Sequence, residues 1–394
     1  MTGPTILLGA VEPSADAMGA ALIARIAERA PDARLIGCGG DAMAARGLSS
    51  VFDTSALSVM GLGDAAKAAP AAIRGARKLA ALAREEGADA AVLIDGWGFS
   101  KLAATRLAKR APGTALVKLA APQVWASRPG RADFVRQHFR LVLTLLPFEP
   151  PLFEGPDTRA VFVGNPNFEA VARAPRSGAA FRARHGLGGA PILAVLPGSR
   201  AGEVSRHMAI FGDAAQSAAS RVPGLRLVIV AAPSVEAQVR RAAERWDEGV
   251  IVVPGTERFD AFDAADAAIA ASGTVTTELA LCGTPLTVGY RTDRATATWA
   301  RRVLVTPYVT ILNIAAGEAV IPERLQEACT PEQLCADAVR LLTDDEARRR
   351  QLSAFKRVLP DLVGPMTAGG AAGRAAEEVL GLIAARGDGA GSGR

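Results

Sequence analysis

The chain has 394 residues, too many for one compact core and enough for two ordinary domains. Hydrophobic residues make up 49% and charged residues 22%, which supplies a core and excludes a largely disordered chain. The formal net charge of +5 favours anionic partners such as nucleotides or phosphorylated lipids. No Lys/Arg run interleaves with aromatic residues, which disfavours a nucleic-acid-binding protein.

Short apolar runs alternate with helical patterns along the first half of the chain. The predicted strands are residues 6–10, 34–38, 90–94, 115–119, 141–145 and 161–163, with helices such as 15–29 and 71–86 between them. Ser14 or Asp16 is the expected cap of the first helix. The strands lack polar alternation, as do strands buried on both faces of a parallel sheet.

The segment 164–178 interrupts this alternation, which then resumes with strands at 192–196, 225–230, 250–253, 267–271 and 286–288. The pattern predicts an α/β fold of two doubly wound, Rossmann-like domains that face a cleft. We expect the first domain at 1–165, the second at 178–365, and a C-terminal helix at 366–394. That helix could return to the first domain, and its Gly-rich end from 387 onward should form a flexible tail.

Two strand-to-helix turns in the second half are candidate diphosphate sites. In the first, Ser199 and Arg200 follow a buried strand, and Glu203 is placed to orient Arg200 or to cap the helix. In the second, residues 272–274 (Ser272, Gly273 and Thr274) open a helix, and Glu278 lies one turn further on. Glu278 is a candidate partner of ribose hydroxyls. Ordinary capped turns with solvated side chains remain the alternative for both.

Polar residues also follow strands in the first half, at the edge where open α/β sheets place ligands. Glu12, Ser14 and Asp16 follow the first strand, and Asp95 ends the third. Trp125 follows the fourth strand and could line an acyl or sugar site. Simple turn chemistry or packing would explain the same residues.

A series of motifs in collinear order resembles the lipid-A-disaccharide synthase family. They are VEPSAD (11–16), VMGLG (59–63), APQVWA (121–126), LPFE (146–149), FVG (162–164), LPGSR (196–200), ASGT (271–274) with Glu278, VGYR (288–291) and YVTILN (308–313). The resemblance extends from about residue 5 to residue 380. It implies the glycosyltransferase B fold, with Ser199 and Arg200 at the diphosphate, residues 272–274 at its phosphate end and Glu278 at the ribose. Asn313 matches an Asn of the family pattern.

The resemblance further implies an activity. It would join UDP-2,3-diacylglucosamine to 2,3-diacylglucosamine 1-phosphate, form a β-1,6-linked disaccharide and release UDP, as an inverting transfer in lipid A biosynthesis. We expect no metal and no cofactor. Both substrates carry acyl chains, so we expect a cytoplasmic protein in peripheral contact with the inner membrane, through residues 59–74 and 295–305.

The chain departs from the family pattern at four positions: Ala15 replaces Gly, Gly98 replaces an Asp that is a candidate base, Asn165 replaces His, and Leu312 replaces Pro. Asp95 or Asp16 is therefore the expected base. Two alternatives stay open: a UDP-sugar-binding relative without turnover, and a sugar-nucleotide enzyme of the same fold with another substrate.

No CxxC pair occurs among the four cysteines (Cys38, Cys282, Cys329 and Cys335), and the three histidines are dispersed. This distribution predicts reduced thiols and no structural zinc site. Uninterrupted apolar runs of about 18 residues, the length of a membrane span, are absent from the sequence. The first apolar run follows no basic segment, so we expect no signal peptide.

Overall fold

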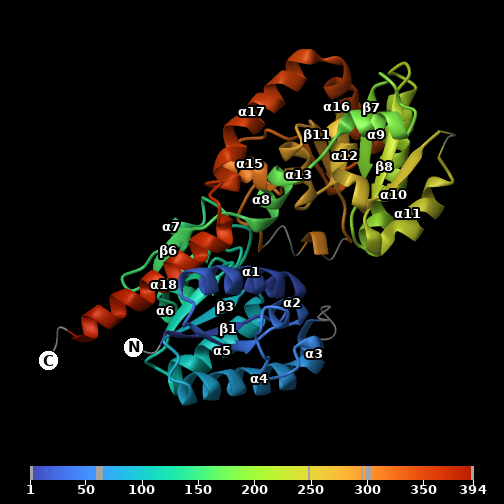
Figure 1. Ribbon diagram of the computed structural model, residues 1–394. Helices are drawn as coiled ribbons and strands as arrows, with labels where there is room; N and C mark the ends of the chain where they lie inside the picture. The colour runs from blue at the N-terminus through green and yellow to red at the C-terminus, as the bar shows by residue number, and fades with distance from the viewer. Residues whose placement is uncertain (1–2, 59–64, 247–248, 294–295, 299–302, 392–394) are drawn as a thin grey trace. The chain divides into compact units, whose positions relative to one another are not determined.

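The computed structural model describes residues 3–58, 65–246, 249–293, 296–298 and 303–391 (Figure 1). The chain forms two compact units, Met1–Pro166 with Gly364–Arg394, and Asn167–Val363. Each unit is built on one six-stranded sheet. No helix of the described residues has the length and apolarity needed to cross a membrane.

The sheet of the first unit is parallel throughout, with the strand order β2-β1-β3-β4-β5-β6. Its strands are β1 (Thr5–Gly9), β2 (Arg34–Cys38), β3 (Ala90–Ile94), β4 (Ala115–Leu119), β5 (Leu141–Thr144) and β6 (Arg159–Phe162). The order reverses at β1, which lies between β2 and β3. In a doubly wound sheet, ligands bind beside such a reversal at the carboxyl ends of the strands.

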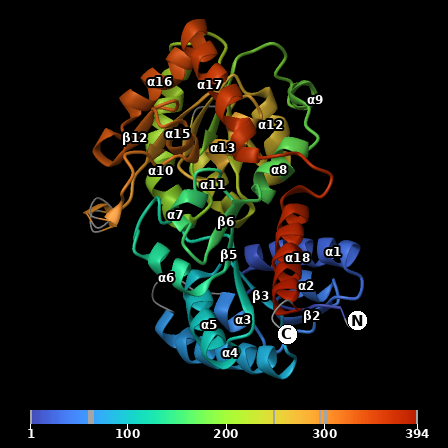
Figure 2. The same ribbon diagram turned by 90° about the vertical axis from the view of Figure 1, so that its left-hand side faces the viewer.

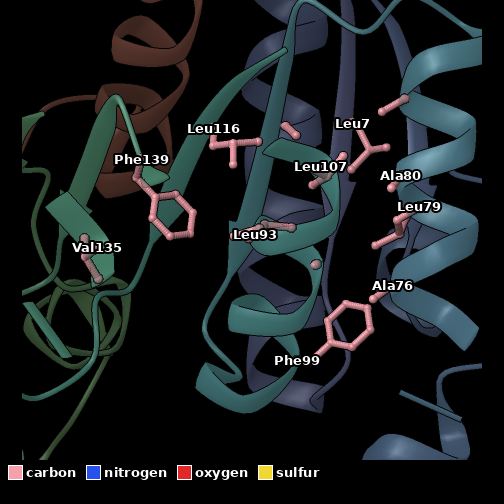
Figure 3. Close-up of a cluster of buried hydrophobic side chains, with 14 of the residues drawn as sticks. Leu7, Ala76, Leu79, Ala80, Leu93, Phe99, Leu107, Leu116, Val135 and Phe139 are labelled. Atoms are coloured by element: carbon pink, nitrogen blue, oxygen red, sulfur yellow. The ribbon is translucent and has the colours of Figure 1, made fainter. Parts of the chain in front are cut away.

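Helices cover both faces of this sheet. They are α1 (Pro13–Arg29), α2 (Asp41–Ala44), α3 (Ser55–Ser58), α4 (Ala65–Glu85), α5 (Trp97–Arg110), α6 (Arg131–His138), α7 (Pro150–Phe153) and α18 (Gly370–Gly391). On one face, Leu79 of α4 and Phe99 of α5 pack against Leu7 and Leu93 of the sheet (Figure 3). This apolar layer fixes α5, and therefore the residues that precede it, against the end of β3.

The C-terminal helix α18 belongs to the first unit and lies beside α1 (Figures 1 and 2). Ala375, Ala376 and Val379 pack against the second face of the sheet. Arg29 of α1 and Glu377 form an ion pair at 2.8 Å. The helix extends to Gly391, past Gly387, where the sequence suggested a flexible tail.

The sheet of the second unit is also parallel, with the order β12-β11-β10-β7-β8-β9. Its strands are β7 (Ile192–Leu196), β8 (Arg226–Ala231), β9 (Ile251–Pro254), β10 (Ala267–Ala271), β11 (Leu286–Tyr290) and β12 (Glu323–Leu325). Five predicted strands, 34–38, 90–94, 115–119, 192–196 and 267–271, have the same bounds in the structure. The other predicted strands differ by one or two residues at one or both ends, and β12 was not predicted.

The helices of the second unit again form two layers. They are α8 (Pro166–Arg173), α9 (Gly178–Arg184), α10 (Ala201–Ala219), α11 (Glu236–Ala243), α12 (Arg258–Ala264), α13 (Val275–Leu281), α15 (Ile311–Ala316), α16 (Pro331–Thr343) and α17 (Asp345–Val363). Phe211 of α10 and Leu334 of α16 pack on one face of the sheet. Helix α8 occupies part of segment 164–178, which the sequence suggested as a break between domains.

Candidate active site

The loop between β7 and α10 is shaped by Glu203. The Glu203 carboxylate accepts hydrogen bonds from the backbone N–H groups of Ser199 (3.1 Å) and Arg200 (3.3 Å), and it pairs with the Arg200 guanidinium at 3.0 Å. Gly198 has a φ of 122°, and a Cβ there would collide with Glu203. The backbone amides of Ser199 and Arg200 are thus bound by Glu203. The Arg200 side chain is 82% exposed and is the loop's principal cation.

A buried histidine, His207, braces the same loop. His207 Nδ1 lies 2.9 Å from the carbonyl oxygen of Pro197, and Nε2 lies 3.0 Å from the backbone nitrogen of Arg291. Nε2 also lies 3.2 Å from the Arg291 carbonyl oxygen. Burial lowers the pKa of His207, which favours the neutral ring, with Nδ1–H donating to Pro197 and Nε2 accepting from the Arg291 N–H. The imidazole therefore ties the loop after β7 to the end of β11, a role that the sequence analysis missed.

The second predicted loop follows β10, the direct neighbour of β7 in the sheet. Because the two strands are parallel and in register, both loops leave the same edge, and the structure brings Arg200 and residues 272–274 to that edge. Gly273 and Thr274 are exposed, and a Cβ at Gly273 would meet nothing within 4 Å. The backbone of this loop is therefore open to a ligand.

Glu278 lies on the first turn of α13, below this loop. Its carboxylate pairs with Arg258 of α12, with Nε and Oε2 separated by 3.4 Å. Burial raises the pKa of Glu278, and the Arg258 charge opposes that shift. The sequence analysis did not name Arg258 as a site residue, because Arg258 and Glu278 are 20 residues apart in the chain.

Asn313 is fully buried, and its side-chain amide is used within the protein. Nδ2 donates to the Ile321 carbonyl and to Glu323 Oε1, both at 2.8 Å, and Oδ1 accepts from the Ile321 N–H at 2.8 Å. Glu323 also accepts from the Thr310 N–H at 2.9 Å. Ser272 Oγ in turn contacts the Val309 carbonyl at 3.5 Å. Asn313 thus supports segment 309–313 behind the β10 loop, and direct contact with a donor stays a prediction.

In the first unit, Glu12 and Asp95 follow the adjacent strands β1 and β3. A Cβ at Gly96 would lie 3.5 Å from Glu12 Oε1, so the Glu12 side chain reaches the residue after Asp95. Burial and the neighbouring Asp95 charge raise the pKa of Glu12, whereas Lys118 lowers it. The structure therefore brings these two carboxylates together at the sheet reversal.

Asp16, the other candidate base, has a different environment. Its buried carboxylate accepts hydrogen bonds from the backbone N–H groups of Gly40 (2.8 Å), Ala42 (2.8 Å) and Met43 (3.1 Å). It therefore caps α2.

The expected cap of α1 by Ser14 or Asp16 was wrong: α1 begins after Glu12 with Pro13 in its first turn, where a missing N–H needs no partner. Ser14 is exposed on that first turn.

Trp125 is held by a buried acid, Glu149. The indole Nε1–H donates to Glu149 Oε1 at 2.9 Å, and Glu149 Oε2 accepts from the N–H groups of Leu145 (3.1 Å) and Leu146 (3.0 Å). Burial raises the pKa of Glu149 to about 7. Phe148 contacts the Trp125 ring edge-on at 5.5 Å. These contacts fix the orientation of a half-buried Trp near the ends of β4 and β5.

Gly98, which stands where the family pattern has an acid, is exposed in the first turn of α5. A Cβ there would meet nothing within 4 Å. The motif at 59–63 lies outside the described residues. Among those described, no group of three or more His, Cys, Asp or Glu side chains could hold a metal ion, and all four cysteines are free thiols.

Two doubly wound parallel sheets, each with polar loops at its carboxyl edge, define a protein of the glycosyltransferase B fold. Solved structures of low sequence identity share this fold. A putative UDP-N-acetylglucosamine 2-epimerase from Listeria monocytogenes has a TM-score of 0.60 at 14% identity, with 95% of each chain covered. S. aureus MnaA with UDP has a TM-score of 0.58 at 12% identity, with 96% of this chain and 95% of that chain covered.

Sequence comparison identifies the family. The model of the lipid-A-disaccharide synthetase family matches residues 6–362. The lipid-A-disaccharide synthase of Paramagnetospirillum magneticum is 38% identical over 363 residues, 91% of this chain and 92% of its own. That of Rhodospirillum centenum is 37% identical over 388 residues, 97% of this chain and 95% of its own. The chain belongs to the lipid-A-disaccharide synthase family.

Proposed function

We propose that this protein joins UDP-2,3-diacylglucosamine to 2,3-diacylglucosamine 1-phosphate, forms the β-1,6-linked lipid A disaccharide and releases UDP. The family match over residues 6–362 carries this proposal. The chemistry of the loops supports it, because one sheet edge presents an exposed arginine, an open glycine turn and a paired glutamate. These groups suit a diphosphate and a ribose.

On the donor side, Arg200 would bind the diphosphate together with the Ser199 hydroxyl. Residues 272–274 would accept its phosphate end, and Glu278 would accept hydrogen bonds from the ribose hydroxyls. Arg258 pairs with the Glu278 carboxylate and favours its charged form. Glu203 and Asn313 would act by holding the two loops in shape.

On the acceptor side, Asp95 is the base that we favour. The acceptor hydroxyl oxygen attacks the anomeric carbon of the donor, and its proton passes to the Asp95 carboxylate. The bond between the anomeric carbon and the diphosphate oxygen breaks, and that oxygen keeps the electron pair. Arg200 stabilises the charge of the departing UDP. Attack opposite the leaving group inverts the anomeric centre. Asp16 is the weaker candidate because three backbone amides occupy its carboxylate.

We further propose peripheral contact with the cytoplasmic face of the inner membrane, since both substrates carry acyl chains. Of the two predicted surfaces, residues 59–64, 295 and 299–302 lie outside the described residues. In the described part, Leu304 is 40% and Val305 57% exposed, which is unusual for large apolar side chains in this chain. Exposed apolar residues of this kind favour contact with lipid.

The test is an assay of UDP release with both acylated sugars, and with each one omitted. Release that requires both sugars supports the proposal. UDP binding without release would show instead a binding protein, consistent with the loss of the family acid at Gly98. Release only with a different acceptor would show a related transferase.

A further inference from the structure

A lysine in the middle of the first sheet is fully buried. Lys118 lies in β4 and is 1% exposed. Its Nζ donates three hydrogen bonds to backbone carbonyl oxygens, those of Asp95 (2.7 Å), Leu119 (3.1 Å) and Leu93 (3.2 Å). All three donor positions of the ammonium group are thus used at the carboxyl end of β3 and β4.

This lysine has no ion pair within 4.0 Å among the described residues, which makes its burial costly. Transfer of an unpaired ammonium group from water into a protein interior is unfavourable, because the group loses its hydration. Desolvation lowers the pKa of Lys118 to about 7, although the negative charges of Asp95 and Glu12 raise it. A neutral side chain of similar length, such as Met, would fill the same space without that cost. The position therefore suggests a role in the adjacent site.

The backbone of Asp95 shows what that role is. Asp95 has a φ of 44°, a left-handed conformation that few residues other than glycine adopt. Its carbonyl oxygen accepts from Lys118 Nζ at 2.7 Å and from Ser100 Oγ at 2.6 Å. Two buried donors therefore hold the peptide after Asp95, and with it the direction of the Asp95 side chain.

The charge of Lys118 acts on the same two residues. Glu12 and Asp95 are like charges on adjacent strand ends, and the Asp95 charge raises the pKa of Glu12. The charged groups that act on Glu12 are Asp95 and Lys118, and those that act on Lys118 are Asp95 and Glu12. The Lys118 charge acts in the opposite direction and lowers the pKa of Glu12.

We infer that Lys118 is a positioning residue for glycosyl transfer: it fixes the backbone of Asp95, and its charge favours the ionised form of the adjacent Glu12, so that Asp95 is held in place to accept the acceptor's proton. The inference rests on the proposed function. Lys118 touches neither substrate in this scheme, and its effect passes through Asp95.

The test compares wild-type protein with Lys118→Met and, as the control, Lys101→Met, which removes an exposed lysine from α5. In Lys118→Met we expect kcat to fall by about tenfold or more, while KM for the donor and affinity for UDP change by less than about twofold. The acid limb of the kcat/KM profile should move up by roughly one pH unit, because the carboxylates lose a neighbouring positive charge. A merely structural role would leave this limb in place. Lys118→Met with wild-type kcat and pH profile would overturn the inference.

A second measurement does not depend on turnover or on the folding of Lys118→Met. The titration of the Lys118 13Cε resonance is followed by NMR in wild type and in Glu12→Gln. Loss of the Glu12 charge should lower the pKa of Lys118, and an unchanged titration would overturn the coupling. If wild type releases no UDP but this shift occurs, the proposed function fails while the link between Lys118 and the carboxylates holds.

Discussion

Arg258 Nε lies 3.4 Å from Glu278 Oε2, and this ion pair joins α12 to the first turn of α13. Glu278 is largely buried, so its carboxylate depends on Arg258 for compensation. The pair stands beside the open loop at residues 272–274. A carboxylate held in this way can accept hydrogen bonds from two neighbouring hydroxyl groups, which is the requirement for a ribose site.

The first prediction concerns this pair. Glu278→Gln should weaken UDP binding by about tenfold, since each charge-assisted hydrogen bond to a hydroxyl contributes roughly 1.5 kcal/mol. Titration calorimetry measures the affinity. A 2′,3′-dideoxy analogue of UDP should bind wild type and Glu278→Gln equally. Glu236→Gln, which alters a half-buried acid of α11 that pairs with Arg240, serves as the control. Equal losses for UDP and for the analogue would contradict the ribose assignment.

Arg200 provides the second prediction. Arg200→Ala should reduce UDP affinity by about 100-fold and uridine affinity by less than about twofold, because charge-assisted hydrogen bonds from a guanidinium to a phosphate are worth up to about 3 kcal/mol. Arg240→Ala removes an exposed arginine of α11 and should leave both affinities unchanged. Unchanged UDP affinity in Arg200→Ala would refute the diphosphate assignment.

The base is addressed by Asp95→Asn. Asn tolerates the left-handed backbone of this position, so the change removes the charge with little strain. We expect kcat to fall by about 100-fold or more, in the range attributed to general bases, with UDP affinity unchanged. Asp16→Asn would instead loosen the cap of α2 and lower the melting temperature. A larger loss of kcat in folded Asp16→Asn than in Asp95→Asn would reverse the assignment.

Gly98→Asp restores the acid of the family pattern at a position with open space. The variant should fold and gain about 0.5 kcal/mol of stability, since an acid replaces glycine in the first turn of α5. If Asp95 is the base, kcat should change by less than about threefold, a small part of the effect of a base. Gly381→Asp, in α18, is the matched control. A rise of about 100-fold in Gly98→Asp would show that the chain lacks its base.

Glu149 gives a prediction about stability and pH. Its pKa is raised from 4.5 to about 7, so the folded protein binds the proton more tightly than the unfolded chain. Protonated Glu149 therefore contributes its full stabilisation when the pH lies below the pKa that Glu149 has in the unfolded chain. This contribution is lost as the pH rises through the pKa that Glu149 has in the folded protein. Between pH 5 and 7 the free energy of unfolding should fall by on the order of 2 kcal/mol.

Urea unfolding at several pH values measures this change. Glu149→Gln should remove that part of the pH dependence, whereas Glu154→Gln, an exposed acid nearby, should retain it. If the free energy of unfolding has the same pH dependence in wild type and in Glu149→Gln, then Glu149 is not the group responsible for it. The same variant should also disturb Trp125, because its indole bonds directly to Glu149.

The strands were predictable because their apolar runs are short and their boundaries are marked by charged residues or glycines, as in 90–94. Strand β12 was not, since Glu323–Leu325 is a three-residue edge strand without an apolar run. Its Glu323 is bonded to Asn313, ten residues earlier, so the role of either depends on tertiary structure. No periodic pattern encodes such a contact.

The residues of the candidate site likewise include some that could be predicted from the sequence and some that could not. Arg200 and Glu278 stand within a few residues of a strand end in the sequence and could be named from that fact. The residues that support them could not. Lys118 stands in an apolar strand, and His207 in the middle of a long helix. What each one contacts is set by neighbouring strands, not by sequence neighbours.

The most direct test of the account is the structure of the reaction product. Wild-type protein is incubated with UDP-2,3-diacylglucosamine and 2,3-diacylglucosamine 1-phosphate, and the lipid product is analysed by NMR. The account predicts one new disaccharide with a β-1,6 linkage, formed in equal amount to UDP. An α-linked product, or hydrolysis of the donor without a disaccharide, would contradict it.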